Sequence, residues 1–204
     1  MTRIAIYMEG GGDRSRGRDA IRRGMDTFLA TLKQAARDKS LKWKLVACGS
    51  RDDAYRGFRN AVETDPQSVN LLLVDSEQPV ANGPRQHLRA RDRWDVSGTP
   101  ESRLHLMVQT METWIIADPA CLAAYYGQGF RPNSLPQRTD LEAEPKRQVA
   151  ASLREATAHT TKGVYHKIRH ASDLLEAIDP DAVRHRCRHC DRLFNELARL
   201  IEAA

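Results

Sequence analysis

Apolar runs alternate with amphipathic segments along the first two thirds of the chain. An unbroken apolar run is typical of a strand buried on both faces of a parallel sheet, and apolar residues spaced by three and four predict a helix. The runs predict strands over 4–8, 41–48, 69–74 and 104–108, and the stripes predict helices that include 21–32 and 54–62. This order predicts an α/β fold with a mostly parallel, Rossmann-like sheet of about four strands flanked by helices.

The alternation of strands and helices stops near residue 140. Asp118 followed by Pro119 is typical of a helix start, with an N-cap and a proline at the first helical position. Further along, the apolar spacing predicts helices over about 145–158 and 179–201. We therefore expect an α/β domain over residues 1–140 and a helical annex over 141–204 that packs on the same domain.

Composition and charge narrow the class of protein. Hydrophobic residues make up 41% and charged residues 29% of the 204 residues, as in a soluble globular protein. No apolar run approaches the roughly 18 residues that span a bilayer, and the start of the chain lacks the pattern of a secretion signal. We expect a cytoplasmic protein with no membrane association. The net charge of +5 and the pI of about 9.2 favour a polyanionic partner such as DNA or RNA.

Four cysteines are too few for a disulfide framework in a chain of this length, so we expect reduced thiols. The segment Cys187-Arg188-His189-Cys190 has the spacing of a zinc half-site. On one continuous final helix, however, both thiols lie on the apolar stripe, while His185 and His189 lie off it. Because a tetrahedral zinc site needs four converging ligands, we interpret Cys187 and Cys190 as core residues.

Carboxylates stand at the ends of two predicted strands. Glu9 follows the first strand, with three glycines (Gly10, Gly11 and Gly12) and Asp13 directly after it, and Asp75 and Glu77 follow the third strand. Ligands of open α/β sheets bind at the carboxyl ends of the strands, and carboxylate oxygens suit Mg²⁺ or Mn²⁺. The glycines let a phosphate come close to the backbone. The alternative is a flexible turn with acidic ends.

Basic side chains suited to phosphate occur in two segments. Arg14, Arg16 and Arg18 follow the glycine loop, and arginine binds phosphate in a bidentate manner. In the annex, a short segment is rich in side chains that can donate to phosphate and stabilise developing negative charge, among them Lys162, His166 and Lys167. A turn followed by a solvated helix start explains the second segment equally well.

Two apolar strands, one followed by Glu9, the glycine loop and Asp13 and the other by Asp75 and Glu77, together form a pattern that resembles the Toprim domain of topoisomerases, primases and OLD-type nucleases. Residues 9–13, 47–51, 74–77, 111–114 with 117–118, and 162–167 more narrowly resemble an uncharacterised Toprim-like family of bacterial proteins. This resemblance covers almost the whole chain. The resemblance implies a Mg²⁺-dependent phosphoryl-transfer site, with Glu9 as acid/base or ligand and Asp75 and Glu77 as ligands. Glu77 departs from the usual Asp-x-Asp pair, and Glu112 is a further ligand if its helix start faces the cluster.

These patterns exclude some functions and favour one. A chain of 204 residues has no room for the strand-gating domains of a topoisomerase or for a primase. Its glycines form neither G-x-G-x-x-G nor a P-loop. We expect a Mg²⁺ or Mn²⁺-dependent nuclease, which by the resemblance works in phage defence with an ATPase partner. The alternative is a non-catalytic nucleic-acid-binding or regulatory subunit with a structural or vestigial metal site.

Overall fold

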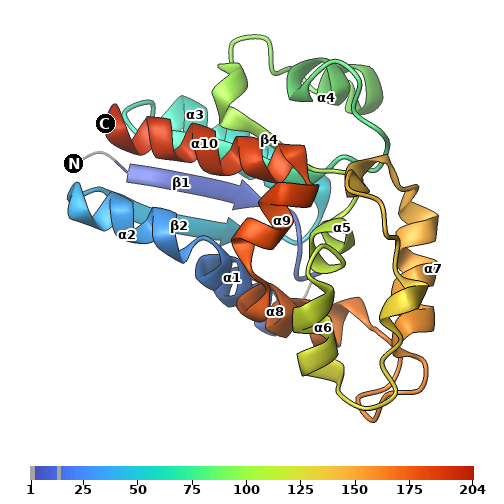
Figure 1. Ribbon diagram of the computed structural model, residues 1–204. Helices are drawn as coiled ribbons and strands as arrows, with labels where there is room; N and C mark the ends of the chain where they lie inside the picture. Colours follow the sequence, from blue (N-terminus) through green and yellow to red (C-terminus); the bar gives the residue numbers. More distant parts are fainter. Residues whose placement is uncertain (1–2, 13–14) are drawn as a thin grey trace.

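A four-stranded sheet with the order β2-β1-β3-β4 forms the centre of the protein, and every neighbouring pair in it is parallel. The computed structural model describes residues 3–12 and 15–204 (Figure 1). The strands are β1 (Arg3–Met8), β2 (Lys42–Ala47), β3 (Val69–Asp75) and β4 (Leu104–Met107). The predicted α/β class, with a parallel sheet flanked by helices, is confirmed.

Ten α-helices are present in the described part of the chain. The first six are α1 (Ser15–Phe28), α2 (Ala30–Asp38), α3 (Arg51–Thr64), α4 (Pro84–Asp92), α5 (Met111–Ile115) and α6 (Pro119–Tyr126). The last four are α7 (Lys146–Thr157), α8 (Lys167–Ala177), α9 (Pro180–Arg186) and α10 (Arg188–Glu202). As the sequence predicts, Asp118 caps α6 by accepting a hydrogen bond from the Cys121 N–H. No described helix is long and apolar enough to cross a membrane.

Two apolar clusters pack on the two faces of the sheet. Alternate residues of β1 divide between them: Ile4 and Ile6 belong to the larger cluster, and Ala5 and Tyr7 to the smaller one. Helix α3 packs in the smaller cluster, whereas α1, α2, α8 and α10 contribute to the larger one. Figure 1 accordingly shows α10 in front of the sheet and α3 behind it. The annex helices α8 and α10 therefore share a core with β1, while the division of the chain at residue 140 stays a prediction.

Two helices predicted as continuous are broken. The first is interrupted at Leu29, between α1 and α2. The last is interrupted at Cys187, whose backbone is extended (φ −134°, ψ 95°). The apolar spacing runs on through both breaks, because Leu29 and Cys187 are themselves fully buried. Apolar spacing alone therefore could not reveal either break.

The interruption at Cys187 changes the position of His189. The prediction that His189 lies off the apolar stripe is wrong. Helix α10 begins anew at Arg188, so its buried face does not continue the buried face of α9, and His189 lies on it. His189 is buried, and its Nδ1 lies 2.6 Å from a Glu142 carboxylate oxygen. The other Glu142 oxygen accepts the His189 backbone N–H at 2.8 Å, which satisfies one of the free donors at the helix start. Cys187 and Cys190 are fully buried in the core, as predicted.

Candidate metal and phosphate site

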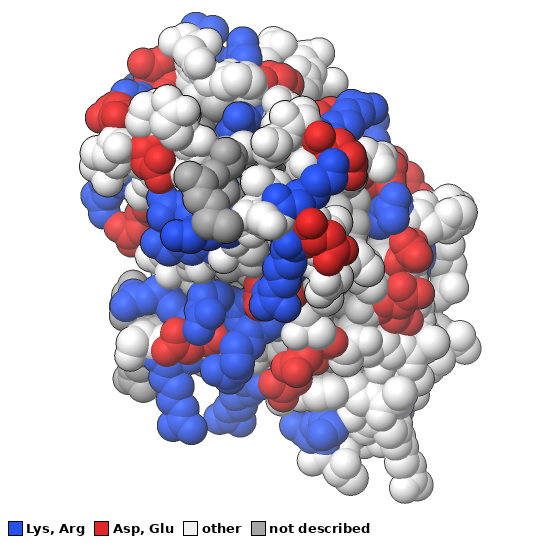
Figure 2. All heavy atoms as spheres, turned by 90° about the vertical axis from the view of Figure 1, so that its left-hand side faces the viewer, with Lys and Arg blue, Asp and Glu red and all other residues white. Residues whose placement is uncertain are grey.

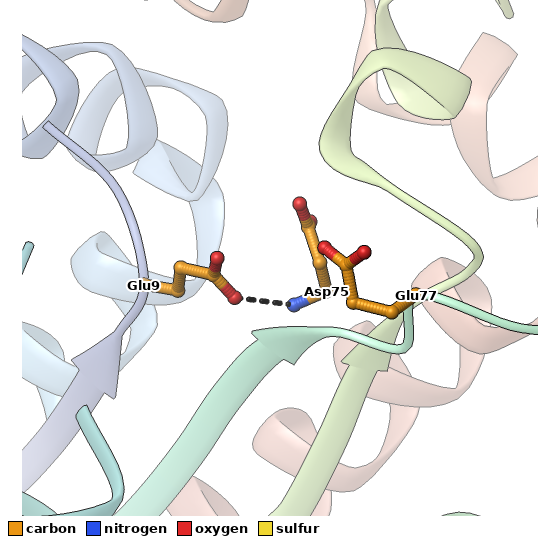
Figure 3. A group of neighbouring side chains, drawn as sticks. All are labelled: Glu9, Asp75 and Glu77. Atoms are coloured by element: carbon orange, nitrogen blue, oxygen red, sulfur yellow. Dashed lines mark hydrogen bonds between the residues drawn. The ribbon is translucent and has the colours of Figure 1, made fainter. Parts of the chain in front are cut away.

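Two acidic side chains lie at the ends of neighbouring strands, at the carboxyl edge of the sheet. Glu9 comes directly after β1, and Asp75 is the last residue of β3, which is adjacent and parallel to β1. The Glu9 carboxylate accepts a hydrogen bond from the Asp75 backbone N–H at 3.2 Å (Figure 3). One carboxylate oxygen from each of Glu9, Asp75 and Glu77 lies within 4.8 Å of the other two. The structure thus brings three predicted metal-ligating residues together, and their role as ligands stays a prediction.

Asp75 is the most buried of these acids, with 1% of its surface exposed. One of its oxygens accepts the Met111 backbone N–H at 2.8 Å, which fixes the side chain against the start of α5. The pKa of Asp75 is raised to about 7, mainly by burial; Lys167 opposes the rise, and Glu9 and Glu112 contribute to it. A divalent cation at this position would favour the ionised form.

Glu77 is held at the cluster by a residue that the sequence did not single out. Its backbone has a left-handed conformation (φ 64°), and its N–H donates to the Gln109 carbonyl at 2.8 Å. Both carboxylate oxygens accept hydrogen bonds from the ammonium of Lys146, at 2.5 and 2.6 Å. Lys146 belongs to α7 in the annex. Glu77 is therefore already paired with a cation from this chain.

A second ammonium group, that of Lys167, lies between Asp75 and Glu112. Its Nζ is 3.6 Å from an Asp75 oxygen and 3.4 Å from a Glu112 oxygen. Burial opposes the charge of Lys167, but Asp75, Glu112 and Glu9 together raise its pKa well above the usual value. The ammonium therefore stays protonated at neutral pH.

Glu112 faces the cluster from the start of α5. Its oxygens accept hydrogen bonds from the Thr110 hydroxyl at 2.5 Å and the Tyr165 hydroxyl at 3.1 Å. Burial opposes ionisation of Glu112, yet its pKa is lowered, mainly by Lys167 and then by the Thr110 hydrogen bond. Lys167 and Thr110 each contact both Glu112 and Asp75 and so link the two acids. Glu112 is not one of the three acids whose oxygens lie within 4.8 Å of one another.

The glycine loop has a backbone that other residues would not easily adopt. Gly10, Gly11 and Gly12 have φ values of 133°, 87° and 60°. A Cβ atom on Gly11 would lie 2.5 Å from the Cα of Arg18, so the loop packs closely on α1. Gly10 also pairs with Gly49 through two backbone hydrogen bonds of 2.9 and 3.2 Å. The described part of the loop is therefore a closely packed turn beside Glu9.

The structure does not bring every predicted phosphate-binding and catalytic residue into contact with the acids. Asp13 and Arg14 belong to the part that is not described. Arg16 is exposed and Arg18 half-buried in the first turn of α1. The ammonium of Lys162 lies 4.5 Å above the Tyr125 ring, and His166 is the exposed N-cap of α8. Within the described residues, neither Lys162 nor His166 forms a hydrogen bond or ion pair with the clustered acids.

Basic and acidic side chains are mixed on the face of the molecule from which the strands start. Figure 2 views this face, and Lys and Arg side chains gather in the lower part of that view with acidic ones among them. The net charge alone does not identify the surface that a polyanion would contact.

Arg51 is a further residue that sequence reasoning did not place in the site. One nitrogen of its guanidinium is 4.0 Å from a Glu9 oxygen, and two others bind Asp92 at 2.6 and 3.2 Å. The guanidinium also lies 4.9 Å from the Trp94 ring centroid. Burial raises the pKa of Glu9, and Arg51 limits that rise. Arg51 stands two residues after Gly49, in one of the sequence blocks that carry the family resemblance, so the sequence could have indicated it. No sequence motif includes Lys146.

The donor set of this centre fits a small divalent cation. The close carboxylates supply hard oxygens from two adjacent strand ends, which is the ligand type that Mg²⁺ and Mn²⁺ prefer. For an ion held at about 2.1 Å from each ligand, two oxygens can be at most about 4.2 Å apart. These oxygens lie within 4.8 Å of one another, so small side-chain movements would bring them to the spacing that the ion requires.

Comparisons with known proteins place the chain in a family. No curated protein and no solved structure matches it. One family model matches residues 8–198, a range that includes every residue of the centre from Glu9 to Lys167. The chain therefore belongs to the family described as a domain of unknown function, DUF4276.

Proposed function

We propose that this protein is a Mg²⁺ or Mn²⁺-dependent phosphodiesterase that cleaves nucleic acid. The observation that carries the proposal is the meeting of Glu9, Asp75 and Glu77 at the ends of two adjacent parallel strands, with their oxygens within 4.8 Å. Such a cluster is costly to bury without a cation, as the raised pKa of Asp75 indicates. A phosphodiester substrate would meet this centre beside the glycine loop.

Glu9, Asp75 and Glu77 are the residues that would hold the cation. When bound, the cation would polarise the scissile phosphate and lower the pKa of a coordinated water. Glu77 takes part once Lys146 releases one of its oxygens, since Lys146 now binds both. Glu9 is suited to a second role, because its raised pKa favours a carboxylate that accepts a proton from water.

Neighbouring basic residues would hold the phosphate. Lys167 carries a stable positive charge beside Asp75, and it can donate to a non-bridging phosphate oxygen. Arg16 and Arg18 lie in the first turn of α1, directly after the glycine loop, and suit the next phosphates of the strand. Tyr165 and Thr110 keep Glu112 in place, so that it balances the charge of Lys167.

The resemblance to Toprim nucleases supports this proposal and extends it. By that resemblance the protein would act in phage defence as the nuclease subunit beside an ATPase. This extension rests on the sequence blocks alone, and the phosphodiesterase proposal does not depend on it.

A second candidate function is a non-catalytic nucleic-acid-binding or regulatory subunit. The observation in its favour is that Lys146 and Lys167 already neutralise Glu77, Asp75 and Glu112. Such a network of ion pairs can be stable without a metal. The two functions differ in whether a divalent cation displaces Lys146 from Glu77.

A cleavage assay tests the proposal. Wild-type protein with Mg²⁺ or Mn²⁺ is expected to cut DNA or RNA, and Asp75→Asn is expected to lose at least roughly a hundredfold of that rate, because a metal contributes several kcal/mol to such reactions. Binding should persist, since the variant removes a carboxylate that repels phosphate. Asp38→Asn, on the exposed end of α2, is the matched control and should keep full activity.

The outcomes separate the two functions. If wild-type protein binds nucleic acid but cuts neither DNA nor RNA with either metal and with a cognate ATPase present, the regulatory function replaces the enzymatic one. If Asp75→Asn cuts as fast as wild type while its thermal unfolding is unchanged, the acids are not the reacting centre.

A further inference from the structure

A cavity of about 250 Å³ opens beside the acidic centre. The glycine loop and α1 line one side of it, and α8 lines the other. Glu9, Asp75 and Lys167 form its polar end. The space is therefore continuous with the position at which a phosphate would meet the acids and the ammonium group.

The remaining walls of the cavity are mostly apolar. The apolar side chains are those of Ala20, Ile21, Met107, Met111, Ile168 and Ala171, and Ser172 adds one hydroxyl group. Ile168 is 76% exposed, which makes it the most exposed large hydrophobic residue in the described part of the chain. It stands directly after Lys167, in the first turn of α8. A large apolar side chain at the mouth of a cavity, next to a buried charge cluster, is suited to cover an apolar surface of a ligand.

We propose that this cavity receives one unpaired nucleobase of a single-stranded nucleic acid. The proposal rests on the phosphodiesterase function and names its substrate class. A base has apolar faces for the walls, and the phosphate attached to its sugar would lie toward Lys167 and the acids. Unpaired bases are held in pockets between apolar or aromatic side chains, and apolar contacts carry little information about the sequence. The apolar walls therefore predict a preference for unpaired strands and only weak sequence preference.

The size of the cavity favours a single base. A cavity of roughly 150 Å³ admits a benzene ring, and pockets for drug-sized ligands have volumes of roughly 300–1,000 Å³. The volume of about 250 Å³ falls between these, which suits one base and is too small for a stacked pair. A base inside a duplex would have to leave its stack before it could enter. Duplex DNA is therefore a poorer ligand than a single strand.

Equilibrium binding to strands with and without bases tests the proposal. The probes are a fluorescently labelled single-stranded 12-mer of thymidylate, the same length of abasic sugar-phosphate strand, and a duplex of equal length, each with Mg²⁺ and with chelator. Wild-type protein is expected to bind the thymidylate strand at least about fivefold more tightly than the abasic strand and the duplex, as expected for one stacked base. Because the readout is binding, it does not require cleavage.

Two variants locate the effect. Ile168→Ser should lower affinity for the thymidylate strand about fivefold and leave affinity for the abasic strand unchanged, since the phosphates still meet Lys167. Val62→Ser is the matched control: Val62 is 38% exposed on α3 and does not line the cavity, so neither affinity should change. Both positions are exposed, so both variants are expected to fold.

Each outcome decides for or against the base site. Equal binding of the base-containing and abasic strands, or no effect of Ile168→Ser on their ratio, overturns it while the phosphodiesterase proposal stands. Discrimination between the strands supports the base site; if cleavage is also absent with either metal and a cognate ATPase present, the enzyme is contradicted while the base site stands. Free thymidine monophosphate that binds as tightly as the 12-mer would assign the cavity to a mononucleotide, and no binding of any strand would reject the proposal.

Discussion

Two ammonium groups share the acids at the carboxyl edge of the sheet. Lys146 binds both oxygens of Glu77, and Lys167 lies between Asp75 and Glu112. These lysines differ in what they would do when a cation binds. Lys167 can stay in place and turn to phosphate, whereas Lys146 competes directly for a proposed ligand. The charges of these two lysines would thus set the affinity of the proposed site for a cation.

Replacing Lys146 tests this competition. Lys146→Gln should strengthen Mn²⁺ binding roughly tenfold, because a charge-assisted hydrogen bond worth about 1.5–3 kcal/mol no longer holds Glu77. Isothermal titration with Mn²⁺ measures the change. Lys39→Gln, which removes an exposed partner of Glu202, is the control and should leave the affinity unchanged. Unchanged or weaker binding by Lys146→Gln would mean that Glu77 is not a ligand.

At the scale of elements, the turn after β1 joins Glu9 to α1 and packs closely on that helix. The turn has a positive φ at three successive glycines and approaches the backbone of α1 closely. A closely packed turn of this kind keeps the carboxylate at the strand end and leaves the backbone open to a phosphate. The glycine turn therefore belongs to the proposed site together with the acids.

A series of glycine substitutions tests the turn. Gly11→Ala should weaken Mn²⁺ and nucleic-acid binding at least about tenfold, because its Cβ would meet the backbone of Arg18 at 2.5 Å and displace the turn. Gly12→Ala has open space but a positive φ, so it should cost only about 1 kcal/mol of stability. Gly98→Ala has open space without a positive φ and should be neutral. Equal binding by all three variants would show that the turn does not shape the site.

The sequence predicted the strands and the acids that end them, because buried parallel strands leave a clear apolar run and their carboxyl ends share one edge. It did not predict the break at Cys187, since the apolar spacing continues through it. Nor did it predict the pairing of Glu77 with Lys146, which are 69 residues apart and joined only by the packing of α7. Long-range partners of this kind leave no local pattern.

At the scale of the whole molecule, one continuous core joins the sheet to the annex helices. Because α8 and α10 pack in the same cluster as β1, the annex brings Lys167 to Asp75 at the end of β3, and it brings Tyr165 to Glu112 at the start of α5. The site is thus assembled from both ends of the chain. Binding of a cation to it should consequently be coupled to protonation of the cluster, in which Asp75 has a pKa of about 7.

Direct titration with Mn²⁺ tests the central claim that the strand-end acids hold a divalent cation. Followed by electron paramagnetic resonance at pH 8, wild-type protein should bind at least one Mn²⁺ per chain, and Asp75→Asn should bind at least about tenfold more weakly. At pH 6 the wild-type affinity should fall roughly tenfold, because Asp75, with a pKa of about 7, must lose its proton to bind. Absence of Mn²⁺ binding by wild type at pH 8, or equal binding by Asp75→Asn, would contradict the claim.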